Sequence, residues 1–80
     1  MIKAMKEKVL EILANIRPEF DFKEDVNFIE EGMLDSFDVV TLVADLDSTF
    51  GISIDGVDIM PENFSSVDSI IKLLVKNGAK

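Results

Sequence analysis

The chain contains no cysteine and no histidine, and these two absences exclude several classes of protein. Without cysteine, neither a disulfide framework nor a thiolate metal site can form. Without histidine, the usual general base and the commonest metal ligand are both missing, so a hydrolase built on a Ser-His or Cys-His pair is excluded. A phosphate-cradling glycine loop is missing too. We therefore expect a carrier or a substrate of other enzymes, not an enzyme, and no resident metal.

Long apolar runs are also absent, because no stretch approaches the length of a membrane span. The first eight residues become amphipathic at once and do not resemble a signal peptide. Hydrophobic residues make up 48% of the chain, which is enough for one folded core. We expect a single domain over residues 1–80, located in the cytoplasm and without an integral membrane segment.

Positive charge is scarce, and the formal net charge is −8 with a sequence pI of about 4.2. Such a surface repels nucleic acid and anionic lipid headgroups and attracts partners with basic patches. Acidity also serves simply to keep a small protein in solution. The charge therefore excludes nucleic acid as a partner but does not by itself identify a function.

Hydrophobic periodicity predicts an all-α fold with three main helices. The first covers residues 2–16, and the second begins at residues 35–36 and ends near residue 50. For the last helix, Ser65 is the expected N-cap and Asp68 completes a capping box. The second connection contains an expected short turn at residues 57–60.

The first connection, residues 19–35, has no sustained periodicity but carries several large apolar residues. Too many of them are present for a solvated linker, so we expect a loop packed over the helices. One helical turn at residues 27–31, closed by Gly32, is expected within it. We expect Phe28, Ile54, Phe64 and Ile71 to fill the core rather than border a hollow, and Met33 and Met60 to fill gaps or anchor loops.

The second helix carries two apolar faces. The expected core face comprises Val39, Leu42, Val43, Leu46 and Phe50. A second stripe, formed by Phe37, Val40 and Ala44, lies on the opposite side. Aspartates border this stripe, namely Asp38, Asp45 and Asp47. Although small apolar residues are often exposed singly, an aligned patch with no packing use favours contact with a protein partner.

The segment from Gly32 to Asp38 places the Ser36 hydroxyl at the start of a helix beside two carboxylates. A helix N-terminus favours an anion such as a phosphodiester, and Asp35 and Asp38 are suited to hold Mg²⁺ during a phosphoryl transfer. Asp and Ser are also preferred capping residues, so the pair taken alone is better explained as a helix cap than as a modification site. Because no base is available to activate Ser36, only another enzyme can modify it.

When the Asp35-Ser36 pair is considered together with the core pattern, the loop lengths and the acidic balance, the chain resembles the acyl carrier protein family. The resemblance is carried by FIEEGMLDSFDVV at residues 28–40, its continuation to Ile54, and PENFSSVDSI at residues 61–70. It implies a four-helix bundle with three main helices and one short one. It also implies that a phosphopantetheinyl transferase attaches 4'-phosphopantetheine to Ser36, with Asp35 beside the magnesium ion. The thiol of the attached arm would then carry acyl or aminoacyl thioesters, which accounts for the missing cysteine.

The resemblance further implies a monomer that docks in turn with several enzymes through its second helix. These would be an acyl- or aminoacyl-activating ligase and downstream acyltransferases or synthases with basic patches. Phe37 stands where leucine or methionine is usual, and the loop at residues 55–64 is longer than in carriers of fatty acid biosynthesis. The first departure leaves the exact partner surface open, whereas the longer loop, together with Leu34-Asp35-Ser36, favours D-alanyl, peptide or polyketide carriers; the cargo stays open. The alternative is an acidic helical interaction module without a prosthetic group, in which Ser36 is only a cap.

Overall fold

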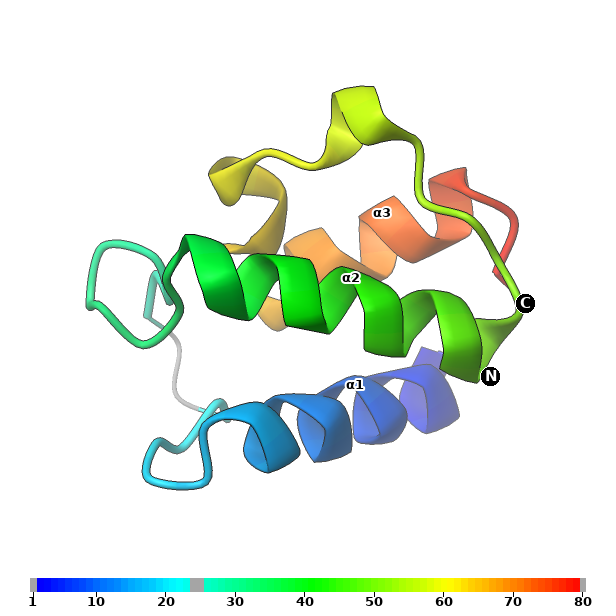
Figure 1. The fold of residues 1–80 in the computed structure, drawn as a ribbon. Coiled ribbons are helices and arrows are strands. Elements are labelled where there is room, and N and C mark those ends of the chain that lie inside the picture. The colour runs from blue at the N-terminus through cyan, green and yellow to red at the C-terminus, as the bar shows by residue number, and fades with distance from the viewer. Residues whose placement is uncertain (1, 24–25, 80) are drawn as a thin grey trace.

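The computed structural model describes residues 2–23 and 26–79, and every regular element in these residues is helical. The elements in chain order are α1 (Ile2–Ile16), α2 (Ser36–Phe50), η1 (Gly56–Asp58), η2 (Pro61–Phe64) and α3 (Val67–Lys76), as Figure 1 shows. The predicted all-α fold with three main helices is confirmed. The single short helix is instead two 3₁₀ turns, because Met60, which precedes a proline, is extended and separates them.

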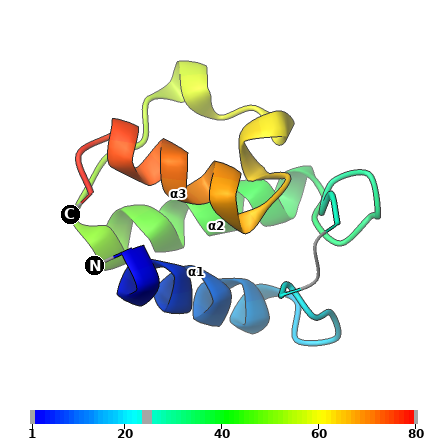
Figure 2. The same ribbon diagram turned by 180° about the vertical axis from the view of Figure 1, so that it is seen from behind.

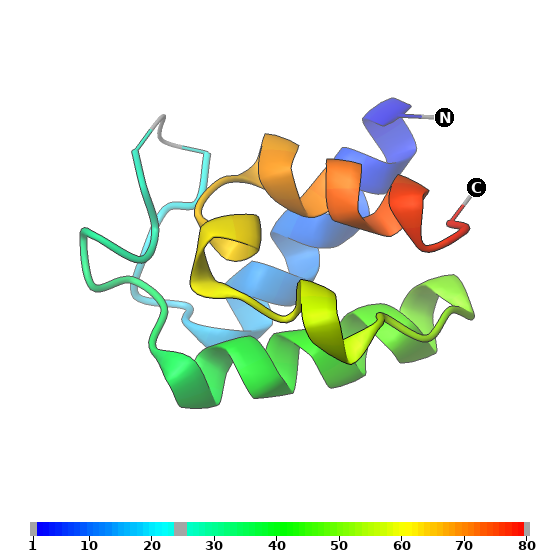
Figure 3. The ribbon, with the colours of Figure 1, turned by 90° about the horizontal axis from the view of Figure 1, so that it is seen from above.

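The helices are arranged so that α1 and α2 run antiparallel while α3 runs in the same direction as α2 (Figures 1 and 2). α1 packs against both α2 and α3, and η2 contacts both α2 and α3. The end of α1 and the starts of α2 and α3 lie at one end of the molecule, together with the first connection (Figure 3). None of the helices described is long and apolar enough to cross a membrane.

The core draws side chains from all three helices and both connections. Its fully buried members include Val9, Leu13, Phe28, Leu42, Leu46, Phe64, Ile70 and Leu74. The predicted core face of α2 is confirmed, with Val43 and Phe50 partly rather than fully buried. The rings of Phe22 and Phe28 pack edge to face with centroids 5.0 Å apart, so the first connection is the packed loop that its composition predicts.

A single helical turn leads this connection towards α2. The Glu31 N–H donates to the Asn27 carbonyl at 2.9 Å, and the Asn27 side-chain oxygen accepts from the amides of Ile29 and Glu30. Gly32 closes the turn at a φ of 72°, a left-handed conformation that favours glycine. The turn expected at residues 27–31 is therefore confirmed, and it delivers the chain to the start of α2.

The predicted start of α3 is wrong by one residue. Ser66, not Ser65, is the N-cap, and its hydroxyl oxygen accepts from the Ser69 N–H at 3.1 Å. The Ser65 hydroxyl donates instead to the Glu62 carbonyl at 2.9 Å, which completes η2. Asp68 is exposed and follows the cap by two residues, so it forms no capping box with Ser66. Two adjacent serines could each have been the N-cap, and Ser65 is not, because its hydroxyl is hydrogen-bonded within η2.

Leu46 tests how much of the stability depends on this small core. It is fully buried in α2, so Leu46→Ala should lower the free energy of unfolding by about 3 kcal/mol through lost burial and a residual cavity. Urea denaturation followed by circular dichroism measures the change. Val40→Ala, at an exposed position of the same helix, should stay within about 0.5 kcal/mol. Equal losses in the two variants would contradict this description of the core.

Candidate functional site

The start of α2 is held by a reciprocal pair of hydrogen bonds. The Asp38 N–H donates to Asp35 Oδ1 at 2.9 Å, and the Asp35 N–H donates to Asp38 Oδ2 at 3.1 Å. Asp35 has an extended backbone and is the N-cap, which makes Ser36 the first residue of the helix. Asp35 and Ser36 are both exposed. The interpretation of Ser36 as the cap is therefore wrong: Asp35 caps the helix, and the serine side chain is accessible to another enzyme.

Arg17, which directly follows α1, brings three carboxylates together at this end of the molecule. Its Nε donates to Asp38 Oδ2 at 2.8 Å, and two other guanidinium nitrogens lie 3.3 Å from Asp35 Oδ2 and 3.4 Å from Glu19 Oε2. The sequence analysis did not predict this contact. No local pattern indicates it, because Asp35 and Asp38 lie 18 and 21 residues further along the chain. The guanidinium links the end of α1 to the start of α2.

The hydrogen bonds and ion pairs of this network shift the pKa values of Asp35 and Arg17. The hydrogen bond from the Asp38 amide lowers the pKa of the Asp35 carboxyl below its ordinary 3.8, and the positive charge of Arg17 lowers it further. The hydrogen bond to Asp38 and the negative charge of that carboxylate raise the pKa of Arg17 above its ordinary value. Asp35 is thus a carboxylate at neutral pH, and its side chain is 57% exposed. Among the described residues, no group of three or more acidic side chains is arranged to hold a metal ion alone.

The apolar stripe on α2 is exposed, as its pattern predicts. Phe37 is 83% exposed and Val40 65% exposed, and Ala44 is exposed beside them. Thr41 lies in the same sector and its hydroxyl donates to the Phe37 carbonyl within the helix. A phenylalanine with this exposure contributes little to the core. The stripe is therefore available to a partner protein.

The three aspartates expected at the border of this stripe differ in their surroundings. Asp45 is exposed and meets the expectation. The expectation is wrong for Asp38, whose side chain is only 13% exposed because it binds Arg17 and the Asp35 amide. Asp47 is half-buried, and its Oδ1 accepts from the Ile54 N–H at 3.0 Å, which orders the segment after α2. Of the three aspartates expected at the border of the stripe, only Asp45 is therefore exposed.

A second apolar surface lies next to Ser36 and was not predicted. An open groove of about 250 Å³ separates α2 from the segment that follows η1; its lining residues are Ile29, Leu34, Asp35, Ser36, Val39, Val40, Ile59 and Pro61. Val57 in η1 and Met60 after it are also exposed, so the expectation that Met60 fills a gap in the core is wrong. Val40 belongs to both the groove and the stripe, which makes the two surfaces continuous.

The segment that forms the far side of this groove is anchored to α3. The buried Asp58 accepts from Lys76 Nζ at 2.7 Å, and the Asp55 N–H donates to the Asn77 side chain at 3.1 Å. Asn63 adds a bond from its side-chain amide to the Asp58 carbonyl at 2.7 Å. These contacts fix the position of η1, and the two to Lys76 and Asn77 join residues distant in sequence. They were not predicted, since the sequence shows only an acidic loop and a basic helix end.

The ion pair of Asp58 and Lys76 gives a prediction for pH dependence. The hydrogen bond from Lys76 lowers the pKa of Asp58 below 3.8, so the pair stabilises the fold above that pH and loses its effect as the pH falls through the lowered value. Asp58→Asn should therefore unfold at lower urea than wild type at pH 7, and the gap should close as the pH falls through the lowered pKa of Asp58. In a Lys76→Gln background the gap should be small at every pH. A gap that is constant with pH in the wild-type background would contradict this.

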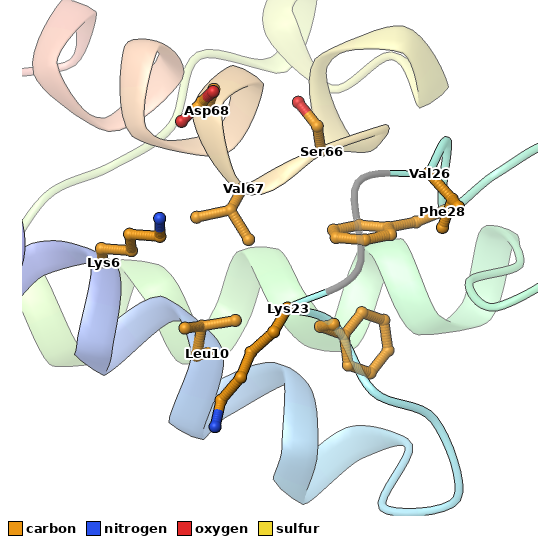
Figure 4. A pocket seen from close by; sticks show the side chains of 9 residues that line it. Lys6, Leu10, Lys23, Val26, Phe28, Ser66, Val67 and Asp68 are labelled. Carbon is orange, nitrogen blue, oxygen red and sulfur yellow. The ribbon is translucent and has the colours of Figure 1, made fainter.

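A larger pocket than this groove lies between α1, the first connection and the start of α3 (Figure 4). It measures about 490 Å³ and is lined by Lys6, Leu10, Phe22, Lys23, Val26, Phe28, Ser66, Val67 and Asp68. Phe28, although it lines this pocket, is 1% exposed, so the expectation that it fills the core is confirmed. The cavity shares no lining residue with the groove beside Ser36 and differs from it in carrying two lysines. It is not part of the site at the start of α2.

Comparison with known proteins gives a consistent result. Residues 4–74 match the family described as "Phosphopantetheine attachment site". The chain is 32% identical over 73 residues to the D-alanyl carrier protein of Bacillus velezensis, covering 89% of this chain and 94% of the other. It is 35% identical over 71 residues to that of Bacillus cereus strain B4264, covering 86% and 90%. With that of Lacticaseibacillus rhamnosus the identity is 42% over 52 residues, covering 62% and 64%.

Proposed function

Because the chain belongs to the phosphopantetheine-attachment family of carrier proteins, we propose that Ser36 is the residue to which 4'-phosphopantetheine is attached. Members of this family are carriers and not catalysts, and they hold the group covalently. One observation above all supports the assignment to Ser36. It is an exposed serine at the first position of α2, and Asp35 supplies the capping oxygen in its place.

The surroundings of Ser36 fit the group in two respects. The first turn of α2 presents backbone N–H groups, which favour a phosphodiester. The exposed carboxylate of Asp35 adjoins Ser36 and is suited to contact a Mg²⁺ ion that a phosphopantetheinyl transferase brings. The bound group supplies a thiol, the nucleophile that a chain without cysteine lacks. The role of the protein itself is to present that thiol to partner enzymes.

We infer that the cargo is small, either D-alanyl or another aminoacyl group. The curated relatives named above are D-alanyl carrier proteins. The groove beside Ser36 is open and only about 250 Å³ in volume, and the core beneath α2 is filled by Leu42, Leu46 and Phe64. A small polar cargo needs no shelter from water, whereas a long acyl chain gains much from burial. These features support an aminoacyl cargo over a fatty acyl one.

We propose that α2 is the docking surface for the ligase that loads this cargo and for the transferase that modifies Ser36. Phe37, Val40 and Ala44 would provide the apolar contact, and the exposed Asp45 the charge at its border. The chain has no lysine or arginine between Lys23 and Lys72, so the charged side chains of residues 24–71, which include α2, are all negative. Such a surface attracts a basic partner and accelerates encounter, while the apolar residues provide affinity.

Two successive mass measurements test this function. Incubation of the purified protein with coenzyme A, Mg²⁺ and a broad-specificity phosphopantetheinyl transferase should add one phosphopantetheine. A D-alanine-activating ligase with ATP should then add one alanyl group, which hydroxylamine should release as expected for a thioester. A fatty-acid-activating ligase serves as the matched comparison and should load the protein poorly. No first mass gain would contradict the attachment site, and preferential loading of a fatty acid would contradict the aminoacyl cargo.

A further inference from the structure

The basic side chain bound to the carboxylates at the start of α2 is Arg17. Residues 30–38, which lead into the first turn of α2, contribute Glu30, Glu31, Asp35 and Asp38, and none of them is basic. The ion pairs found among the described residues bring only Arg17 to Asp35 and Asp38. Local negative charge is therefore high at the position where the proposed function adds a further anion.

We propose, on the basis of phosphopantetheine attachment at Ser36, that Arg17 is a positioning residue and counter-ion that stabilises the modified form more than the unmodified one. Its Nε holds Asp38, and a second nitrogen holds the outer oxygen of Asp35, the residue next to Ser36. Both carboxylates are thereby directed towards the end of α1. Their negative charge is offset before the phosphodiester is added.

Arg17 acts in two ways that can be measured separately: as a tether between α1 and α2, and as a positive charge near the phosphodiester. The fork of Arg17 contacts two oxygens at once, and this geometry tethers α1 to α2 in both forms of the protein. Its positive charge acts on any anion nearby, and that interaction increases when Ser36 carries a phosphodiester. A purely structural tether would stabilise both forms equally. A counter-ion stabilises the modified form by an additional amount that salt weakens.

The test is a thermodynamic cycle between Arg17 and modification. Urea unfolding is measured for the unmodified and modified forms of wild type, Arg17→Gln and Arg17→Lys, and for Lys3→Gln as the control for loss of one positive charge. Lys3 is exposed near the start of α1, at the other end of the molecule from the start of α2. The forms are separated by intact mass before unfolding.

Arg17→Gln should lower the stability of both forms. The factor by which it raises the unfolding constant should be about threefold larger in the modified form than in the unmodified form. Arg17→Lys should restore this additional factor but not the shared loss, because it keeps the charge and loses the fork. About 0.5 M salt should remove the additional factor, and Lys3→Gln should show none. Equal losses in both forms for Arg17→Gln would overturn the proposal. Failure of the wild type to accept the group would instead contradict the attachment site.

Discussion

Ser36→Ala should accept no phosphopantetheine, and less than about 1% of the wild-type mass gain should remain after prolonged incubation with the transferase. The hydroxyl oxygen is the atom that forms the phosphodiester, and alanine offers no substitute. The fold should survive, because the cap of α2 is Asp35 and the side chain of Ser36 is exposed. We expect the free energy of unfolding to change by no more than about 0.5 kcal/mol. Intact mass spectrometry and urea denaturation measure the two effects.

A matched serine makes this result specific. Ser48 is also exposed on α2, near its other end, so Ser48→Ala should be modified like wild type. Modification of Ser36→Ala at any appreciable level would place the attachment elsewhere. Loss of modification combined with loss of the helical signal would indicate unfolding, and Ser36→Thr would then separate the two effects by keeping a hydroxyl at the same position.

The sequence predicted those parts of the fold that depend on local patterns. Periodicity and terminal signals gave α1 and α2 their observed bounds, since apolar spacing and a glycine after the last turn act within a few residues. The attachment site was predicted from one short segment in register with the helices around it. Its main features, an exposed serine at the start of α2 and an exposed apolar stripe, are present in the structure.

The features that the sequence did not predict depend on contacts between distant segments. Arg17 pairs with residues across the first connection, and Lys76 pairs with Asp58 across the second. These contacts follow only from the packing of the helices, and nothing in the local pattern selects them. The same reason explains the error at Asp38, which a helical wheel places near the border of the stripe but which turns inward to meet the guanidinium.

The groove beside Ser36 could not be predicted from the sequence for the same reason. Ile59 and Pro61 lie more than twenty residues after Ser36, and η1 and η2 bring them against α2. The sequence indicated a long loop but not that its apolar side chains would extend the exposed stripe. A partner that recognises α2 therefore meets a surface with two components, one predicted from the helix and the other created by the tertiary structure.

Phe37→Asp should reduce the efficiency with which the modified protein is loaded by its ligase by about 30-fold or more, the loss typical of an aromatic anchor at the centre of an interface. Among the side chains that the structure describes, Phe37 is the most exposed large apolar one, and it adjoins Ser36, so we expect a docked enzyme that reaches the arm to contact it. Stability should not fall. An aspartate at the second position of α2 interacts favourably with the helix dipole, and the lost ring is 83% exposed.

The rate of thioester formation at several carrier concentrations measures this effect, and Ser48→Asp is the control. Ser48 lies in the same exposed sector and receives the same charge, but it is eleven residues, or about 16 Å, further along the helix. We expect Ser48→Asp to change the loading efficiency by less than about threefold. If both variants lose activity to the same extent, added charge and not the ring is responsible, and the apolar stripe is not the contact. If Phe37→Asp loads normally, the ligase reaches the arm from another side, and the groove lined by Ile59 and Pro61 becomes the surface to test.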